Sequence, residues 1–253
     1  MGNIESFDFT DTTDLPQRGD LLYRIADGSL ARTVEKFLLC DGVVSFYKNT
    51  EQAYFFPDDL ALYRRHRLPT PRTIPAIYRE RDLLQKASLA VGGFPLVLKI
   101  LGKSHGVGIL KVDSPEALSS MVDILNKEKN EIVMKEFIPH KKHARLIVLG
   151  NEVIDSIAYI SKGGDFRTNV GKDILVAPEK FSPEIEAIAI KAVSVSGWEF
   201  GGVDIIIHEK TGAPFLAEVN FPCFFPRAED ITGVPIAQKM LEYLVKKSAR
   251  LVV

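Results

Sequence analysis

Cysteine is scarce in this 253-residue sequence, because only Cys40 and Cys223 occur. Two cysteines so far apart exclude a disulfide scaffold and a cysteine-rich zinc site, and they favour a reducing compartment. No apolar stretch reaches the roughly 18 residues that cross a bilayer, and the polar start does not resemble a signal peptide. The sequence therefore predicts a soluble, cytoplasmic protein with no membrane partner.

A strong net charge is also missing, since 32 Lys and Arg against 33 Asp and Glu give a formal charge of −1. This balance provides no global attraction to nucleic acid or to an anionic surface. Two basic runs, residues 64–67 and 140–143, are not interleaved with aromatic residues. A solvated surface is therefore favoured over a nucleic-acid patch for both runs, and we expect no nucleic-acid partner.

Several familiar catalytic and nucleotide-binding motifs are absent from the sequence. It has no Walker loop, no G-x-G-x-x-G fingerprint and no G-x-S-x-G nucleophile elbow. Internal repeats and low-complexity segments are missing too. With 46% hydrophobic and 26% charged residues, the composition is that of an ordinary globular protein. Nothing in the sequence argues for covalent catalysis.

The amino-terminal part predicts a small α/β unit. Residues 19–25 and 43–49 are expected as strands, and residues 28–42 as a helix with Ser29 as N-cap and Gly42 beyond its end. Four prolines and an arginine run between residues 57 and 75 then suggest a helix that ends in an extended linker.

The remainder mixes strands and helices without strict alternation. Strands are expected within 94–112, 131–138 and 144–160, the last with a turn at Gly150-Asn151. Two helices carry start signals, 114–127 behind Ser114 and 182–197 behind Ser182. The last helix starts at Pro235, and its expected inward residues are Ile236, Met240, Leu241, Leu244 and Val245. This order predicts an α+β fold with antiparallel sheets.

The strongest hairpin signal is VDIIIHEKTGAPFLAEVN, residues 203–220. A three-residue loop at 210–212, with Gly212 in the left-handed position, pairs the strands by a constant sum of 422. Asp204 then lies opposite Glu218, and Asn220 points to the same face. Facing carboxylates repel unless a cation lies between them, and an all-oxygen set suits Mg²⁺. The alternative is a merely polar, exposed sheet face, which the apolar neighbours disfavour.

A lysine stands within the apolar run PLVLKIL, where its charge is costly unless it meets an anion. This residue, Lys99, could also snorkel at a sheet edge. The loop GKSHGVG, residues 102–108, follows it and could bring backbone N–H groups close to phosphate oxygens. We expect His105 in this loop to face solvent or phosphate rather than to act as a base.

The order of these features resembles the ATP-grasp superfamily, and more closely its RimK-type branch of α-L-glutamate ligase-like enzymes. The ordered features are a strand lysine, a glycine-loop hairpin, a helix, the MKEFI strand, a hairpin with Asp, and Glu-x-Asn. The resemblance covers roughly residues 55–247. It implies an ATP-grasp fold in which two α+β lobes clasp ATP and the glycine loop closes over the phosphates.

The resemblance also assigns roles to individual residues. It places Lys99, Ser104, Gly106 and Gly108 at the phosphates, and Asp204, Glu218 and Asn220 as ligands of Mg²⁺, with Mn²⁺ as an alternative. The hinge around adenine is implied to be Lys135, Glu136, Phe137 and Ile138. Catalytic positions that hold the transferring phosphoryl group are implied to be Arg145, Arg167 and Asn169. For Arg145, a surface strand arginine remains the alternative.

The implied reaction is ATP-dependent ligation of a carboxylate and an amine through an acyl phosphate, with an amino acid or small peptide as substrate. Such chemistry needs charge neutralisation and positioning more than a nucleophilic side chain. Two alternatives stay open. One is a regulatory or scaffold protein that binds nucleotide without ligase turnover, and the other is phosphotransfer to a hydroxyl.

The sequence departs from the family pattern in several places. A strand–helix pair and a phosphate-binding lysine before the linker are missing, and Arg64 or Arg65 could substitute for the lysine. His143 stands at the usual acidic ribose contact. Residues 221–228 replace a glycine-bearing turn, and their phenylalanines could line an acceptor or carboxylate pocket, form an interface or pack in the core.

The expected organisation has three parts. Residues 1–68 form a shortened pre-ATP-grasp domain and linker, 69–139 the amino-terminal lobe with the glycine loop, and 140–253 the carboxyl-terminal lobe with the metal site. The identity of the substrates stays open at this point. The shortened first domain makes a homo-oligomer an open alternative.

Overall fold

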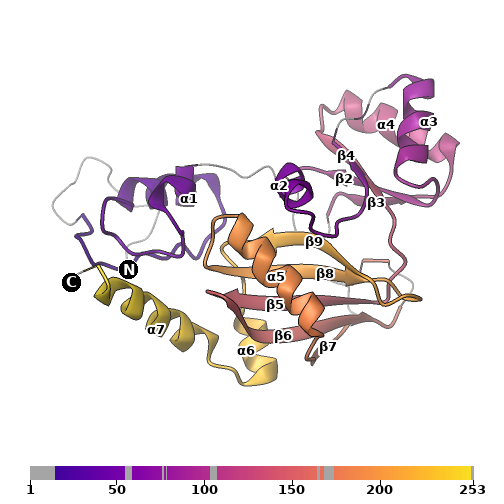
Figure 1. The fold of residues 1–253 in the computed structure, drawn as a ribbon. Helices are drawn as coiled ribbons and strands as arrows, with labels where there is room; N and C mark the ends of the chain where they lie inside the picture. Colours follow the sequence, from indigo (N-terminus) through magenta and orange to yellow (C-terminus); the bar gives the residue numbers. More distant parts are fainter. Residues whose placement is uncertain are drawn as a thin grey trace.

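The computed structural model describes residues 15–54, 59–75, 77, 79–102, 107–163, 166–167 and 174–251. These residues form two antiparallel sheets, each with its own helices, and a small amino-terminal unit (Figure 1). The mixed order of strands and helices gives the α+β class that the sequence predicts.

The first lobe is built on a four-stranded sheet in the order β1-β4-β2-β3. Its strands are β1 (Thr73–Ile74), β2 (Leu96–Ile100), β3 (Ile109–Val112) and β4 (Ile132–Glu136). Helices α3 (Arg81–Ala90) and α4 (Pro115–Lys127) cover the sheet. The core between them contains Leu84, Leu96, Leu98, Leu118 and Met134.

The second lobe is a five-stranded sheet in the order β7-β6-β5-β8-β9. Its strands are β5 (Lys142–Leu149), β6 (Glu152–Ser161), β7 (Ile174–Pro178), β8 (Phe200–Ile207) and β9 (Pro214–Asn220). Helix α5 (Pro183–Val195) packs on one face against Ala144, Leu146 and Val203. Alternating residues, Ile147 and Ile157 among them, pack on the opposite face.

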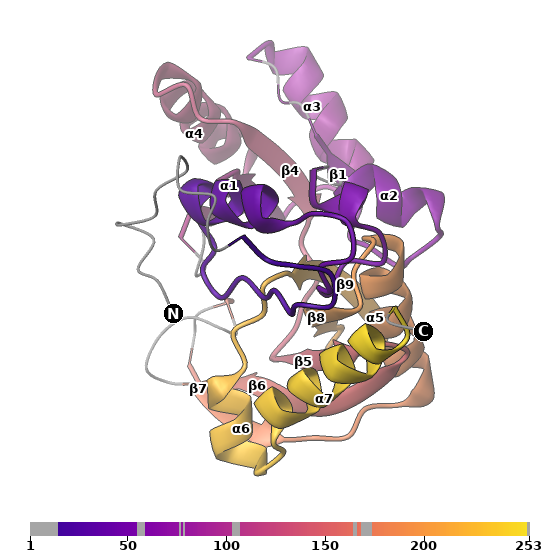
Figure 2. The same ribbon diagram turned by 90° about the vertical axis from the view of Figure 1, so that its left-hand side faces the viewer.

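That opposite face is covered in part by α6 (Pro226–Thr232) and α7 (Ile236–Ala249), as Figure 2 shows. Met240 and Leu244 of α7 are buried there with Phe46 and Phe200. One end of the sheet face is therefore closed by apolar packing, and the other end is left for polar residues.

The amino-terminal unit contains α1 (Ser29–Leu38), the 3-10 helix η2 (Thr50–Tyr54) and α2 (Asp59–Arg65). The two predicted strands are wrong, because residues 19–25 and 43–49 contain only the isolated bridges of Leu21 with Val44 and Tyr47 with Trp198. Helix α1 ends at Leu38, three residues earlier than expected. Its N-cap is Gly28 rather than Ser29, which lies in the first turn.

The two expected caps in the lobes are confirmed. The Ser114 hydroxyl accepts from the Ala117 N–H at 3.2 Å, and the Ser182 hydroxyl accepts from the Ile185 N–H at 3.4 Å. Each helix has proline at its first position. These short-range signals were predictable because a cap is local.

The last helix begins where the sequence indicated, with Pro235 as its N-cap. Ile236, Met240 and Leu244 are buried, but Leu241 and Val245 are 59% and 56% exposed. The prediction of these two as inward residues is wrong. Helix α7 buries a narrow stripe against the sheet, and Leu241 instead lines an open apolar cavity beside Phe224.

Both cysteines are free thiols, Cys40 exposed and Cys223 buried. Among the described residues, none of the helices combines the length and the apolar character needed to cross a membrane.

Lys247 of α7 makes three polar contacts, two of them with the amino-terminal unit. The Lys247 ammonium donates to the carbonyls of Ser45 and Tyr47 at 2.9 and 2.8 Å and pairs with Glu199. We expect Lys247→Met to keep the aliphatic packing but to leave these acceptors unmet, and so to lower the free energy of unfolding by about 1–3 kcal/mol.

Urea unfolding followed by circular dichroism measures this change. The control is the neighbouring exposed Lys246→Met, which we expect to change the free energy of unfolding by less than about 0.5 kcal/mol. Equal effects in the two variants would contradict the role given to Lys247.

Candidate active site

The polar end of the second sheet holds the predicted acids. Asp204 on β8 pairs with Glu218 on β9, as the sequence indicated. The Asn220 amide lies 3.3 Å from Asp204 Oδ2 and 3.4 Å from Glu218 Oε1. All three side chains therefore converge, with the amide between the carboxylates.

The predicted pair is present, but the register of the hairpin differs from the predicted one towards the loop. A β-bulge lies between Asp204 and Ile205, where pairing passes from Asp204↔Glu218 to Ile205↔Leu216. The loop is also one residue longer, because the His208 N–H still donates to the Ala213 carbonyl. The constant sum of 422 therefore fails beyond Asp204 towards the loop, although Gly212 adopts the expected positive φ of 71°. The extra loop residue and the bulge cancel each other in the register, so Asp204 still pairs with Glu218.

The buried carboxylate of Asp204 is bound by an arginine. Arg145 on β5 donates to both oxygens of Asp204, from Nε at 2.5 Å and from Nη2 at 2.8 Å. Strand β5 lies between β6 and β8, and the Arg145 side chain is only 16% exposed, so it is not a surface arginine. Burial would raise the pKa of Asp204, but the Arg145 charge and His143 outweigh it and hold that pKa well below its ordinary range.

The first lobe reaches the same cluster through Lys99. Its ammonium lies 3.3 Å from Glu218 Oε2, across the boundary between the lobes. Strand β2 is an interior strand, so Lys99 does not snorkel at a sheet edge. Two carboxylates and two cations thus balance each other at this boundary.

His143 lies on the same side of β5 as Arg145. Its Nε2 is 3.6 Å from Asp204 Oδ1, and its ring stacks on Tyr159 with centroids 4.7 Å apart. The expectation of a solvated basic run at 140–143 is wrong for His143, which is buried. The run starts in the irregular segment before β5 and enters this central strand at Lys142, which composition did not reveal.

The hinge residues follow β4. The Glu136 carboxylate takes a bidentate pair from Arg72, at 3.0 and 2.9 Å, which lowers its pKa. The Glu136 N–H donates to the Arg72 carbonyl, and the Ile138 carbonyl lies 2.6 Å from the His140 ring nitrogen.

An aromatic surface adjoins the hinge. The Lys111 ammonium lies 5.1 Å from the centroid of Phe137, and Phe166 contacts Phe137 edge-on at 6.1 Å. Lys135 precedes this hinge on β4 and is half-buried, and Arg167, directly after Phe166, is half-buried as well. Strands β3 and β4 and the segment at 166–167 thus meet around Phe137.

The remaining predicted site residues lie elsewhere in the structure or outside the described residues. Gly108 lies in the turn directly before β3 with a φ of 79°, and its carbonyl accepts from the Ile100 N–H. Ser104, His105, Gly106 and Asn169 lie outside the described residues. Arg64 and Arg65 are exposed in the last turn of α2.

Residues 221–225 divide between three environments. Phe221 stacks on Trp198 at 5.2 Å, and Phe225 packs against Phe200. Phe224 is 75% exposed. Cys223 is buried, which raises the pKa of its thiol to about 11, and a Cβ added to Gly202 would lie 2.4 Å from its sulfur. Glycine before Val203-Asp204 is therefore a sequence signal for this close approach.

The residues fit a divalent cation in donor chemistry. Asp204, Glu218 and Asn220 supply oxygen ligands of the kind that Mg²⁺ prefers, and an amide rotation would present the Asn220 oxygen. Among the described residues, no group of three or more His, Cys, Asp or Glu side chains could hold a metal, so any such site depends on the amide.

Two antiparallel α+β lobes that meet at this cluster define an ATP-grasp fold, and solved structures agree. The ATP-grasp ligase PsnB, complexed with minimal precursor, Mg and ADP, matches with a TM-score of 0.67 at 18% identity, over 87% of this chain and 68% of that chain. The D-alanine–D-alanine ligase from Bacillus anthracis matches with a TM-score of 0.63 at 19% identity, over 88% and 76%. At such identities the likeness shows the fold alone.

The particular family follows from the sequence match. Residues 59–244 match the RimK-like ATP-grasp domain, and the chain belongs to that family. It is 34% identical over 160 residues to a probable alpha-L-glutamate ligase of Klebsiella pneumoniae (strain 342), which is 62% of this chain and 53% of the relative. It is 33% identical over 156 residues to the ribosomal protein bS6–L-glutamate ligase of Salmonella newport (strain SL254).

The chain therefore spans about half the length of these curated relatives, since the second match covers 61% of this chain and 51% of that ligase. The amino-terminal unit before residue 59 lies outside the matched family domain.

The Arg145–Asp204 pair is testable through its pH dependence. Because the folded-state pKa of Asp204 is depressed, its stabilisation is present above the unfolded pKa of about 3.9 and is lost as pH falls further. We expect Arg145→Met to lower the free energy of unfolding by about 3–5 kcal/mol at pH 7, because a buried carboxylate loses its partner.

In that variant, burial without the guanidinium raises the pKa of Asp204, so the deficit should shrink between pH 7 and pH 5. Urea unfolding at both pH values measures the deficit, and the exposed pair Arg81–Asp123 supplies the control Arg81→Met, with less than about 1 kcal/mol expected. A deficit that does not change with pH would instead indicate lost packing.

Proposed function

We propose that this protein is an ATP- and Mg²⁺-dependent carboxylate–amine ligase that forms an amide bond and releases ADP and phosphate. The observation that carries the proposal is the charge-balanced cluster of Asp204, Glu218, Arg145 and Lys99 at the boundary of the two lobes. Family membership and relatives named as glutamate ligases support it.

The charged side chains of this cluster can exchange their ion-pair partners when the nucleotide binds. Asp204, Glu218 and Asn220 would hold Mg²⁺, and Mn²⁺ could replace it. The metal, bound with ATP, would neutralise charge on the phosphates. Arg145 and Lys99, each now paired with a carboxylate, would then be free to face phosphate oxygens. The cations needed for phosphoryl transfer are thus already present at the site.

The nucleotide would lie between the lobes. The Glu136 carbonyl and the Ile138 N–H would meet the adenine edge, Phe137 would cover its face, and Lys135 would point toward the nucleotide. Gly108, with Ser104 and Gly106, would belong to the loop over the phosphates. Arg167 and Asn169 would hold the transferring phosphoryl group, as the family resemblance implies. The three-part division at residues 68 and 139 belongs to the same proposal.

The chemistry follows without a nucleophilic side chain. A substrate carboxylate oxygen attacks the γ-phosphorus, the bond to ADP breaks, and an acyl phosphate forms. The amine nitrogen then attacks the acyl carbon, phosphate leaves with the electron pair of the broken C–O bond, and the nitrogen loses a proton. Because both steps shift negative charge between oxygens, fixed cations and exclusion of water determine the rate.

The substrate carboxylate and amine would come from an amino acid or a peptide. The names of similar proteins support this class, since one is a ribosomal protein bS6–L-glutamate ligase and another ligase was solved with a minimal precursor.

Glu218→Gln tests the proposal. Removing this carboxylate charge should lower ADP release by at least about 100-fold over a panel of amino acids and peptides, with the fold kept because Glu218 is half exposed. ADP release is measured by a coupled assay, and product mass confirms the amide.

The matched control is Glu209→Gln in the loop of the same hairpin, whose side chain is exposed. It should keep full activity. Full ligation by Glu218→Gln would overturn the proposal. Tight ATP–Mg²⁺ binding in calorimetry without turnover on any substrate pair would favour a nucleotide-binding regulator instead.

A further inference from the structure

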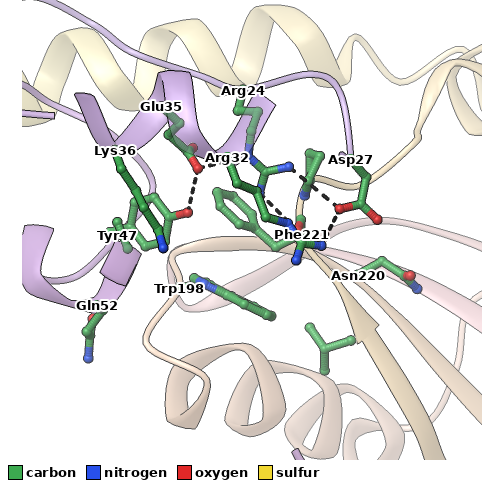
Figure 3. A pocket seen from close by; sticks show the side chains of 13 residues that line it. Arg24, Asp27, Arg32, Glu35, Lys36, Tyr47, Gln52, Trp198, Asn220 and Phe221 are labelled. Carbon is green, nitrogen blue, oxygen red and sulfur yellow. Dashed lines mark hydrogen bonds and ion pairs between the residues drawn. The ribbon is translucent and has the colours of Figure 1, made fainter. Parts of the chain in front are cut away.

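A charged pocket lies beside the acid cluster, between the amino-terminal unit and the second lobe (Figure 3). It has a volume of about 230 Å³. At about 30 Å³ for a water in the liquid, it holds roughly eight water-sized groups, which is enough for one amino acid.

One helix face supplies the charged wall. Arg32, Glu35 and Lys36 stand at spacings of three and four on α1, so they share a face, and all three line the pocket. Arg24 and Asp27, from the segment before α1, complete the charged set. Three cations and two acids make the lining positive by one charge.

The buried part of this wall is structural. Arg24 donates to Glu35 at 2.8 Å and to the Ala26 carbonyl at 2.6 Å, and the Tyr47 hydroxyl donates to Glu35 at 2.9 Å. Burial lowers and Glu35 raises the pKa of Arg24, and Glu35 prevails, so Arg24 stays charged. Arg32, which pairs with Asp27, and Lys36 are less buried and are the cations nearer to solvent.

The opposite wall is the end of β9. Val219, Asn220 and Phe221 line the pocket, and Trp198 stacks on Phe221 to form an aromatic floor. Asn220 therefore belongs to both the acid cluster and the pocket. A molecule in the pocket would have one end at Asn220 and the other at α1.

We propose that this pocket binds the amine substrate, and that this substrate is an amino acid whose own carboxylate pairs with Arg32 and Lys36 while its amine faces Asn220. The inference rests on the proposed function and narrows it to one substrate class. A positive lining attracts a carboxylate that does not react, and it disfavours an amine that lacks one. Amino-terminal residues outside the matched family domain thus select the amine.

The experiment compares an L-amino acid with its α-amide as the amine, at a fixed carboxylate substrate, and measures kcat/KM for ADP release. The wild-type protein should prefer the free acid, and Lys36→Met or Arg32→Met should reduce this preference about 10- to 100-fold, mainly through KM. Lys36→Glu should turn the preference toward the amide. The control is Arg18→Met, which removes an exposed cation of the same unit.

The possible results separate the two proposals. If ADP release depends on Glu218 but the preference survives in Arg32→Met and Lys36→Met, the pocket inference is wrong and the ligase proposal stands. If no amine supports turnover, calorimetry that compares the binding of L-amino acids with that of their α-amides tests the pocket inference. Binding of the acid that weakens in Lys36→Met but not in Arg18→Met supports the pocket, and equal binding in all proteins overturns it.

Discussion

The buried ion pair between Arg145 and Asp204 is the interaction on which the site depends. A carboxylate enclosed by apolar residues on a central strand is stable only with a cation at hydrogen-bond distance, and the neighbouring strand supplies it. This pair keeps Asp204 ionised and in place. Glu218, Asn220 and Lys99 then extend the same network across the lobe boundary.

The two faces of the second sheet explain why this network can exist. Odd and even positions of β5 and β8 separate, so one set packs under α5 and the other faces the site. Apolar residues of helices α6 and α7 cover the far end of this face, and the first lobe approaches the near end. Packed apolar residues therefore surround the polar cluster, but the cluster itself consists of polar side chains.

The amino-terminal unit has a comparable role at the end of β9. Arg24 donates to the Phe221 carbonyl at 3.4 Å and lies over its ring, while Tyr47 and Trp198 contact the same ring. The residue directly after Asn220 is thus held from three sides. A segment outside the matched domain consequently helps to fix the strand end that carries the Asn220 amide.

Short-range interactions allowed many of the helices and the acid-bearing hairpin to be predicted from the sequence. Serine caps, prolines at helix starts and the glycine of the hairpin turn act over a few residues, so the helices behind Ser114 and Ser182 and the hairpin at 203–220 were identified from sequence. Strand predictions at 19–25 and 43–49 failed because those segments lack pairing partners beyond isolated bridges. The bulge in β8–β9 was also missed, since alternation alone cannot show an extra residue.

By itself, the sequence determined which side chains could form the acid cluster, because a hairpin with two acids and an amide brings them to one face whatever surrounds it. Tertiary structure alone decided that Arg145 neutralises Asp204, that Lys99 reaches Glu218 from another lobe, and that Arg32, Lys36 and Trp198 share a pocket with Asn220. These contacts join residues far apart in the chain. They depend on how sheets and helices pack, which periodicity and caps do not specify.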